Sequence, residues 1–161
     1  MDPLGKSPIP VPALIAGKTA MLACWIFALA EKLDLITPLY RNPASTIAGM
    51  LLLSFGAIIA VASFFFLGRS LSVGLPSGKT ELRTGGLYRV SRNPIYAGAF
   101  LMCAGSCLIT PHPLNYALFV FTVAIHHRIV LREERFLEER FGDEWRAYRQ
   151  RVRRYAGATR F

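Results

Sequence analysis

Long apolar segments separated by short charged ones dominate the pattern of this chain. Residues 42–68 and 93–127 contain no Lys, Arg, Asp or Glu over 27 and 35 residues. A helix needs about 20 apolar residues to cross the hydrocarbon core of a bilayer. The first segment therefore predicts one membrane-spanning helix, and the second predicts two that fold back on each other. The predicted fold class is all-α, a polytopic membrane helix bundle with about four transmembrane helices, near residues 11–30, 46–67, 94–110 and 113–131.

The first predicted span admits a second interpretation, because Lys18 interrupts its apolar run. The same residues can form a signal peptide, with Lys6 and Lys18 in its basic region and Ala28-Leu29-Ala30 as its cleavage motif. Such a basic region would be unusually long and rich in proline, which favours a retained helix. Between the third and fourth spans, Pro111-His112-Pro113 leaves room only for a tight helical hairpin.

Beyond the fourth span the apolar spacing becomes that of an amphipathic C-terminal helix. Gly142-Asp143 predicts a break, with Gly142 as a C-cap, Asp143 as an N-cap and a second helix running to about residue 154. The face formed by the apolar positions either lies on the membrane surface or closes over a pocket on the cytoplasmic side. These positions recur at spacings of 4, 4, 3 and 4 and are Leu137, Phe141, Trp145, Tyr148 and Val152.

Composition and charge exclude a soluble domain. The chain has 161 residues, is 53% hydrophobic and only 18% charged, with 19 Lys plus Arg against 10 Asp plus Glu. Soluble domains carry about 25% charged residues, and this length predicts a single domain over residues 1–161. The excess positive charge lies at the ends of apolar segments, where it orients helices and contacts lipid headgroups. We therefore expect membrane lipids as partners, and no nucleic acid.

The distribution of Lys and Arg predicts the orientation. Residues 69–92 carry five and residues 128–161 carry ten, whereas the loop at 31–41 carries two. Segments rich in Lys and Arg stay in the cytoplasm, and two spans separate the rich segments, so both can lie there. We expect an integral protein of a prokaryotic inner membrane with a cytoplasmic C-terminus.

The three cysteines predict packing and not chemistry. Cys24, Cys103 and Cys107 lie inside apolar stretches, without His or Cys at the spacing of metal ligands nearby. We expect neither a disulfide framework nor a metal site.

Two adjacent carboxylates, Glu133 and Glu134, follow the fourth span directly. A carboxylate near the bilayer is costly unless it is paired or solvated. Neighbouring residues point about 100° apart around a helix, so one of the two can face the bundle. Salt bridges to nearby arginines of the same helix, Arg132, Arg135 or Arg140, are the simpler alternative.

The residues before the third span predict an anion site. Asn93 is placed as an N-cap and Pro94 at the first helical position, so that free N–H groups face the loop. Arg92 adds a guanidinium fork that suits a carboxylate or phosphate. Gly98, one turn further on, admits close approach of a ligand or of another helix. An ordinary loop followed by a capped helix is the alternative.

Together these motifs resemble the isoprenylcysteine carboxyl methyltransferase family, which is grouped with the membrane phospholipid methyltransferases. Order and spacing both match over roughly residues 64–153. Asn93 stands where the family commonly has His, which removes a group able to titrate near neutrality. The matching residues are Glu81-Leu82, Gly85-Gly86-Leu87-Tyr88-Arg89, Arg92-Asn93-Pro94-Ile95-Tyr96-Ala97-Gly98, Glu133-Glu134 and Phe141-Gly142-Asp143-Glu144-Trp145-Arg146-Ala147-Tyr148.

The resemblance implies a membrane enzyme that uses S-adenosylmethionine, bound between the loop before the third span and the tail after the fourth. It implies catalytic roles for Arg92 and Glu133, and a lipophilic acceptor that enters from the bilayer: a prenylated cysteine carboxylate, another carboxylate, a thiol or a lipid amine. His126 and His127 are either substrate-side groups or interfacial histidines. The cofactor contacts it implies are Leu82, Tyr88, Arg92, Asn93, Pro94, Tyr96, Gly98, Glu133 and Glu134.

Two alternatives compete with a methyltransferase. Membrane reductases of the sterol-reductase type resemble this family in their C-terminal bundle and bind NADPH there, although their larger number of spans argues against them. The other alternative is a non-catalytic membrane subunit. Binding of S-adenosylhomocysteine or of NADPH distinguishes the three.

Overall fold

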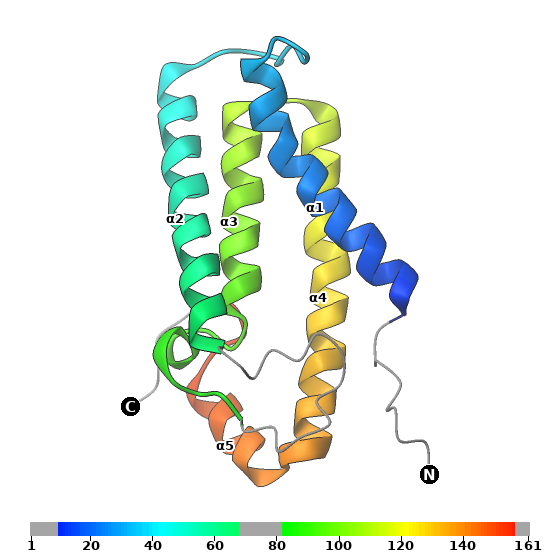
Figure 1. Cartoon of the computed structure of the whole chain (residues 1–161), viewed down its shortest axis with the longest axis vertical. Helices are drawn as coiled ribbons and strands as arrows, with labels where there is room; N and C mark the ends of the chain where they lie inside the picture. Colours follow the sequence, from blue (N-terminus) through cyan, green and yellow to red (C-terminus); the bar gives the residue numbers. More distant parts are fainter. Residues whose placement is uncertain (1–9, 68–81, 157–161) are drawn as a thin grey trace.

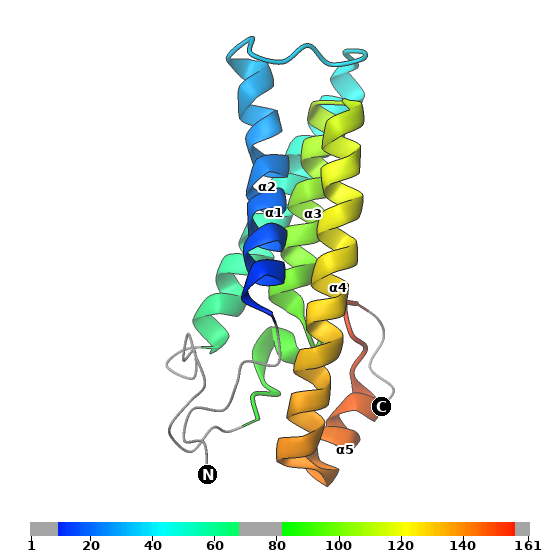
Figure 2. The ribbon, with the colours of Figure 1, turned by 90° about the vertical axis from the view of Figure 1, so that its right-hand side faces the viewer.

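The computed structural model describes residues 10–67 and 82–156 as an up-and-down bundle of helices. Helices α1 to α4 run along its long axis, and α5 packs at the end where α4 extends beyond the others (Figure 1, Figure 2). A 3-10 helix, η2, precedes α3. The elements in chain order are α1 Val11–Lys32, α2 Pro43–Leu67, η2 Gly86–Arg89, α3 Pro94–Ile109, α4 Pro113–Phe141 and α5 Asp143–Arg151.

The predicted all-α class is confirmed, and three helices have the length and composition of membrane spans. These are α1, α2 and α4. The apolar helix α3 has 16 residues, which rise about 24 Å against a hydrocarbon core of about 30 Å. Two residues of the predictions, Lys6 and Glu81, lie outside the described residues.

Helix α2 packs closely on α3 because glycines meet at two levels of the contact. A Cβ on Gly56 would lie 2.5 Å from the carbonyl oxygen of Gly98, and a Cβ on Gly49 would lie 2.6 Å from that of Gly105. Without side chains at these positions the two backbones approach closely, as in many pairs of membrane helices.

Helix α1 packs against α3 and α4 and is held by a small buried core. Cys24, Cys103 and Cys107 form this core and are free thiols, which confirms their prediction as packing residues. Asn115, at the start of α4, accepts a hydrogen bond from Cys24 Sγ at 3.1 Å and donates one to the carbonyl of Thr110 at 3.2 Å. The tight hairpin predicted between α3 and α4 is thereby tied to α1.

The predicted break at Gly142 is present, and α4 turns there into α5. Gly142 has φ +51°, a conformation that favours glycine. Asp143 is the first residue of α5 and does not cap it; its carboxylate instead accepts a hydrogen bond from Arg146 at 2.7 Å. Helix α5 ends at Arg151 and not near residue 154, because Val152 takes up an extended conformation.

The apolar stripe of this region is buried inside the protein. Trp145 is only 2% exposed, and the stripe folds on itself at the break between α4 and α5. The side chains that pack together are Trp145, Tyr148 and Val152, with Leu82, Leu137 and Phe141 against them. The stripe therefore closes a small core at one end of the bundle.

Candidate active site

The residues predicted to carry chemistry come together where the apolar part of α4 ends, at Leu131. Residues 132–141 of α4 continue past this point as a charged helix (Figure 2). Arg92, before α3, and Arg154, beyond α5, donate hydrogen bonds to Glu134 in this part of α4. Tyr155 contacts His127 of α4 and Phe100 of α3 nearby. The site therefore lies at the charged end of the bundle.

Glu134 joins three segments of the chain. It is 6% exposed, and its two oxygens accept hydrogen bonds from Arg92 Nη2 and Arg154 Nη2, each at 2.9 Å. Burial alone would raise the pKa of Glu134, but the two guanidinium groups outweigh it and lower that pKa below its usual range. Its partners thus come from the start of α3 and from the chain end, and not from neighbouring positions on α4.

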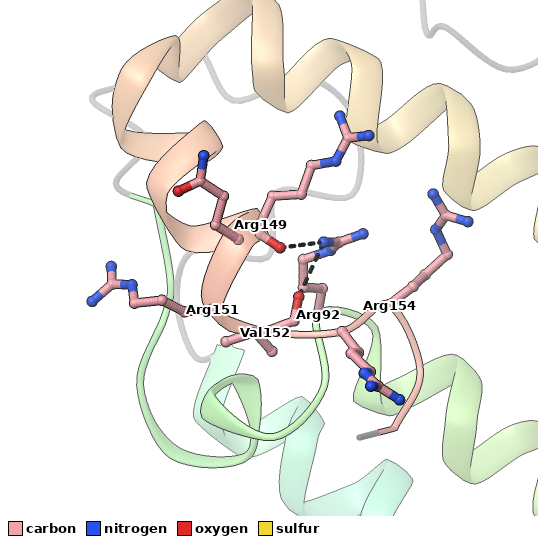
Figure 3. Close-up of a pocket in the computed structure, with 7 residues that line it drawn as sticks. Arg92, Arg149, Arg151, Val152 and Arg154 are labelled. Atoms are coloured by element: carbon pink, nitrogen blue, oxygen red, sulfur yellow. Dashed lines mark hydrogen bonds between the residues drawn. The ribbon is translucent and has the colours of Figure 1, made fainter. Parts of the chain in front are cut away.

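Arg92 is saturated by the protein itself. Its side chain is 6% exposed, and Nε and Nη2 donate to Glu134 at 3.2 and 2.9 Å. Nη1 donates to the carbonyls of Arg149 and Val152 at 3.1 and 3.0 Å, as the dashed lines in Figure 3 show. The guanidinium also lies 5.7 Å from the ring centre of Trp145. A ligand that uses the predicted fork has to exchange with these partners.

Two backbone donors just before α3 are occupied in the same way. The N–H of Arg92 donates to the carbonyl of Arg153 at 2.9 Å, and that of Asn93 to the carbonyl of Arg154 at 3.0 Å. Asn93 holds the N-cap position, but its side chain does not cap the helix. Its amide donates instead to Glu134 at 3.4 Å and to the Arg154 carbonyl at 3.3 Å.

Glu133 has different surroundings from its neighbour. Tyr96 Oη donates to Glu133 Oε1 at 3.2 Å, and within residues 10–67 and 82–156 no salt bridge reaches this carboxylate. Burial raises the pKa of Glu133 to about 7; the hydrogen bond from Tyr96 opposes the rise, and the charge of Glu134 adds to it. Glu133 is therefore a partly buried acid whose pKa lies well above its usual value.

Aromatic side chains surround Glu133. Tyr88 on η2 is buried, and its carbonyl accepts a hydrogen bond from Tyr148 Oη at 2.7 Å. Burial raises the pKa of Tyr88 to about 12, and the charge of Glu133 adds to the rise. The Tyr96 ring centre lies 5.5 Å from that of His126. An acidic group and several aromatic faces therefore meet in one place.

The chain end covers another side of this region. Tyr155 Oη lies 2.9 Å from His127 Nδ1, and its ring centre lies 5.5 Å from that of Phe100 on α3. His126 is buried beside Tyr96. The two histidines thus contact aromatic residues of the site and of the chain end.

The remaining predicted residues have structural contacts. Leu82 packs against the core around Trp145, Pro94 is buried at the first position of α3, and Gly98 faces Gly56 of α2. Of the two alternatives predicted for Gly98, the structure contains the close approach of another helix. The cofactor contacts of these three residues remain predictions.

Sequence reasoning missed Arg154 and Tyr155. The charge of this segment was assigned to helix orientation and lipid headgroups. Its density, with five arginines between residues 146 and 154, was the available signal. The number of arginines does not reveal that Arg154 shares Glu134 with Arg92.

An open cavity of about 380 Å³ lies between the start of α3 and the chain end, and Figure 3 shows it in close-up. Arg149 and Arg154 extend from it toward α4, where Glu138 and Glu134 accept their hydrogen bonds. Its lining residues are Arg92, Arg149, Gln150, Arg151, Val152, Arg153 and Arg154.

Apolar helices with a partly buried charged site at one end define an integral membrane protein whose site lies next to the bilayer. Comparison with known families makes this specific. The family model described as phospholipid methyltransferase matches residues 44–144, from the start of α2 to the start of α5. The match covers more than half of the chain, which belongs to the phospholipid methyltransferase family.

Curated relatives agree with this assignment. A probable protein-S-isoprenylcysteine O-methyltransferase of Oryza sativa subsp. indica is 26% identical over 155 residues, which cover 92% of this chain and 81% of the relative. The protein-S-isoprenylcysteine O-methyltransferase of Mus musculus is 30% identical over 108 residues, or 65% of this chain and 38% of the relative. That of Saccharomyces cerevisiae is 27% identical over 144 residues, or 86% and 60%. The resemblance drawn from the motifs is confirmed: this is a membrane methyltransferase by family.

Proposed function

We propose that this protein transfers a methyl group from S-adenosylmethionine to a lipophilic acceptor at the charged end of α3 and α4. The observation that carries the proposal is Glu133, a partly buried carboxylate without a salt bridge among the described residues, near Tyr88 and Tyr96. A cation placed there would find a counter-charge and aromatic faces together. The sulfonium and amino groups of S-adenosylmethionine are such cations.

The cationic part of the cofactor fits this donor set. Glu133 would accept hydrogen bonds from its amino group or ribose, and Tyr88 and Tyr96 would line its sulfonium and adenosyl surface. Bound S-adenosylmethionine supplies the electrophilic methyl group. Its carboxylate needs donors, for which we propose Arg92 and Asn93.

Those anion donors are held by the protein's own carbonyls. The carbonyl oxygens of Arg153 and Arg154 accept from the N–H groups at the start of α3. A bound carboxylate would therefore have to take their place, and the chain end would move as the cofactor enters. Tyr155, packed on Phe100 and His127, would then help to exclude water.

The other residues of the site act by positioning. Glu134 ties Arg92 to Arg154 and so fixes the start of α3 against the chain end. Once the cofactor has entered, these ion pairs would hold an acceptor and a methyl donor at reacting distance, which is the main requirement of an in-line displacement. A carboxylate acceptor needs no base, whereas for an amine or thiol Glu133 would take up the proton.

The acceptor we propose first is a prenylated cysteine carboxylate, because the curated relatives are named for protein-S-isoprenylcysteine. Other carboxylates, thiols and lipid amines are the further members of the class. Such a molecule would enter from the bilayer between α2 and the α3–α4 pair, with Arg92 orienting its reacting end.

We further propose that α3 makes a fourth crossing despite its 16 residues. Its tight hairpin with α4 and its contact with α2 keep it inside the bundle, where polar ends are easily accommodated. With four crossings, the charged end and the C-terminus lie on the cytoplasmic side of a prokaryotic inner membrane.

Calorimetric titration of the full chain in detergent with S-adenosylhomocysteine tests the cofactor. We expect saturable binding by the wild type, at least tenfold weaker binding by Glu133→Gln, and no heat from NADPH. Glu139→Gln is the matched control, because Glu139 is an exposed carboxylate on the same helix. No binding of S-adenosylhomocysteine by folded wild type would refute the proposal. Binding of NADPH would then favour a reductase, and binding of neither ligand would favour a non-catalytic subunit.

Membranes that contain the protein, incubated with methyl-tritiated S-adenosylmethionine and N-acetyl-S-farnesylcysteine, test the acceptor. A carboxylate acceptor gives an ester, so its label is released by mild base. Label that resists base would instead identify an amine or thiol acceptor. Glu133→Gln, with its weakened cofactor site, is the negative control.

A further inference from the structure

The arginines that line the cavity at the chain end differ in their partners. Arg92 and Arg154 share one carboxylate, that of Glu134, each at 2.9 Å. Arg149 pairs with Glu138 at 3.2 Å. These three guanidinium groups are held by carboxylates of α4.

Two other arginines that line the cavity, Arg151 and Arg153, differ from these three. Arg151 extends away from Arg92 (Figure 3), and both Arg151 and Arg153 are exposed. Within the part of the chain that the structure describes, no carboxylate pairs with either of them. We call Arg151 and Arg153 the basic rim.

Helix stabilisation explains only part of this charge. Arg149 and Arg151 lie in the last turn of α5, where positive charge favours the helix dipole, and Arg151 Nε donates to the carbonyl of Ala147 at 3.2 Å. Arg153 lies beyond the helix, so the dipole does not account for it. Both rim residues keep guanidinium N–H groups free for another partner.

The level of the cavity in the fold indicates the partner. Arg92, which lines it, lies two residues before Pro94, the first residue of the apolar helix α3. The cavity therefore opens where the apolar helices end, at the level of lipid phosphates. Guanidinium groups bind phosphate through paired hydrogen bonds, and basic clusters just outside membrane helices select anionic lipids.

We propose that the basic rim binds the phosphate of an anionic phospholipid headgroup, with part of the headgroup in the cavity. The side chains of the rim have no role in the proposed methyl transfer, although Arg92 lines the same cavity, and the proposal does not depend on that function. A soluble phosphate compound offers the same chemistry, so the test has to distinguish the two sources.

Calorimetric titrations of the delipidated full chain with dioctanoyl phosphatidylglycerol, dioctanoyl phosphatidylcholine and inorganic phosphate provide that test. We expect saturable binding of the phosphatidylglycerol, and at least tenfold weaker binding of the other two. The double variant Arg151→Gln/Arg153→Gln should lose at least tenfold in affinity for phosphatidylglycerol. The control, Arg135→Gln/Arg140→Gln, removes the same charge from exposed positions on α4 outside the cavity and should bind like the wild type.

Several outcomes would overturn the proposal. Equal losses of affinity in the two double variants would show that the lipid is attracted by the overall positive charge of the protein and not by a specific site. Inorganic phosphate bound as tightly as phosphatidylglycerol would assign the rim to soluble phosphate compounds, and equally tight phosphatidylcholine would remove the preference for anionic lipid. Wild-type protein that binds no phosphatidylglycerol would also refute it. Both variants should unfold at the same temperature as the wild type, which excludes misfolding as the cause of a lost affinity.

Discussion

Glu133 and Glu134 are adjacent in the sequence but have opposite electrostatic surroundings. Glu134 lies between two guanidinium groups, which lower the pKa of its carboxyl. Glu133 receives one hydrogen bond, from Tyr96, and burial raises its pKa to about 7. Because consecutive helical residues point about 100° apart, one carboxylate faces the start of α3 and the chain end while the other faces the tyrosines.

Replacing Glu134 with Gln should strongly destabilise the protein at pH 7. The change leaves two arginines without their counter-charge, and removal of one partner from a buried ion pair costs about 3 kcal/mol or more. The lowered pKa means that this stabilisation exists above the ordinary value of 4.5 and is lost as pH falls through the folded value. Unfolding followed by circular dichroism in detergent should show a deficit at pH 7 that shrinks in acid.

The control for that variant is Glu139→Gln, which changes an exposed carboxylate on the same helix. It should leave the free energy of unfolding within about 0.5 kcal/mol of the wild type. Similar deficits in both variants would contradict the proposed role of Glu134 in joining α3 to the chain end.

Replacing Glu133 with Gln should have the opposite effect on stability. The raised pKa means that the ionised group costs stability as pH rises from 4.5 through about 7, whereas below 4.5 it is neutral in both states. The variant should therefore be more stable than the wild type at pH 8, by an amount on the order of 2 kcal/mol, and nearly equal at pH 4. A difference that does not change with pH would refute the assigned titration.

Asn93 shows what a neutral residue does at this position. Its amide donates to Glu134 and to the carbonyl of Arg154, so it joins the same network without carrying a charge. An amide keeps its donors at every pH, whereas the family's common His would titrate near neutrality. In the proposed function, proton uptake from an amine or thiol acceptor would therefore fall to Glu133.

At the scale of elements, the contact between α2 and α3 depends on two pairs of glycines. Gly49 and Gly56 lie seven residues apart on α2, and Gly98 and Gly105 lie seven apart on α3. In an antiparallel pair this places Gly49 against Gly105 and Gly56 against Gly98. The close contact fixes the start of α3, and hence Arg92, relative to the rest of the bundle.

Substitution of Gly56 by Ala should separate these helices. Its Cβ would lie 2.5 Å from a backbone oxygen of α3, which cannot move independently. We expect a loss of about 1–3 kcal/mol in the free energy of unfolding, as for other overpacked contacts, measured by chemical unfolding in mixed micelles. Gly85→Ala, where a Cβ meets nothing within 4 Å, should be neutral; equal losses would argue against the packing role.

At the scale of the whole molecule, the chain end returns to the beginning of α3. Arg153 and Arg154 bind backbone groups about sixty positions earlier, and Glu134 of α4 lies between the two segments. One small region therefore holds the site of the proposed methyl transfer and, on its outer side, the basic rim. The apolar helices place both next to the bilayer, from which a lipophilic acceptor and an anionic lipid would come.

Much of this architecture was predictable because the elements are set by local chemistry. Long runs without charge predicted α2 and the α3–α4 pair, the prolines around His112 predicted the hairpin, and Gly142 predicted the break. The prediction of α1 left a signal peptide as the alternative, because Lys18 interrupts its apolar run. The boundaries of α5 were predicted less well. Asp143 does not cap it, and Val152 leaves the helix early to pair with Arg92.

The candidate site was predictable in its members but not in its bonds. Motifs identified Arg92, Asn93, Tyr96 and the two glutamates, and the family comparison supports the methyltransferase assignment. The N–H groups of Arg92 and Asn93 proved to donate to the carbonyls of Arg153 and Arg154, and the Arg92 guanidinium to Glu134 and two carbonyls of the tail. No local pattern announces such a pairing, since any of the many arginines in the tail could have been the partner.

By itself, the sequence determined that this chain is a helical membrane protein of the methyltransferase family, because hydrophobic length and motif spacing are properties of short segments. Only the tertiary structure decided which carboxylate pairs with arginines, which backbone donors are occupied and which arginines have no carboxylate partner. Those outcomes depend on contacts between residues 92, 134 and 154, and the energy of a charge depends on what surrounds it in space and not on its neighbours in the chain.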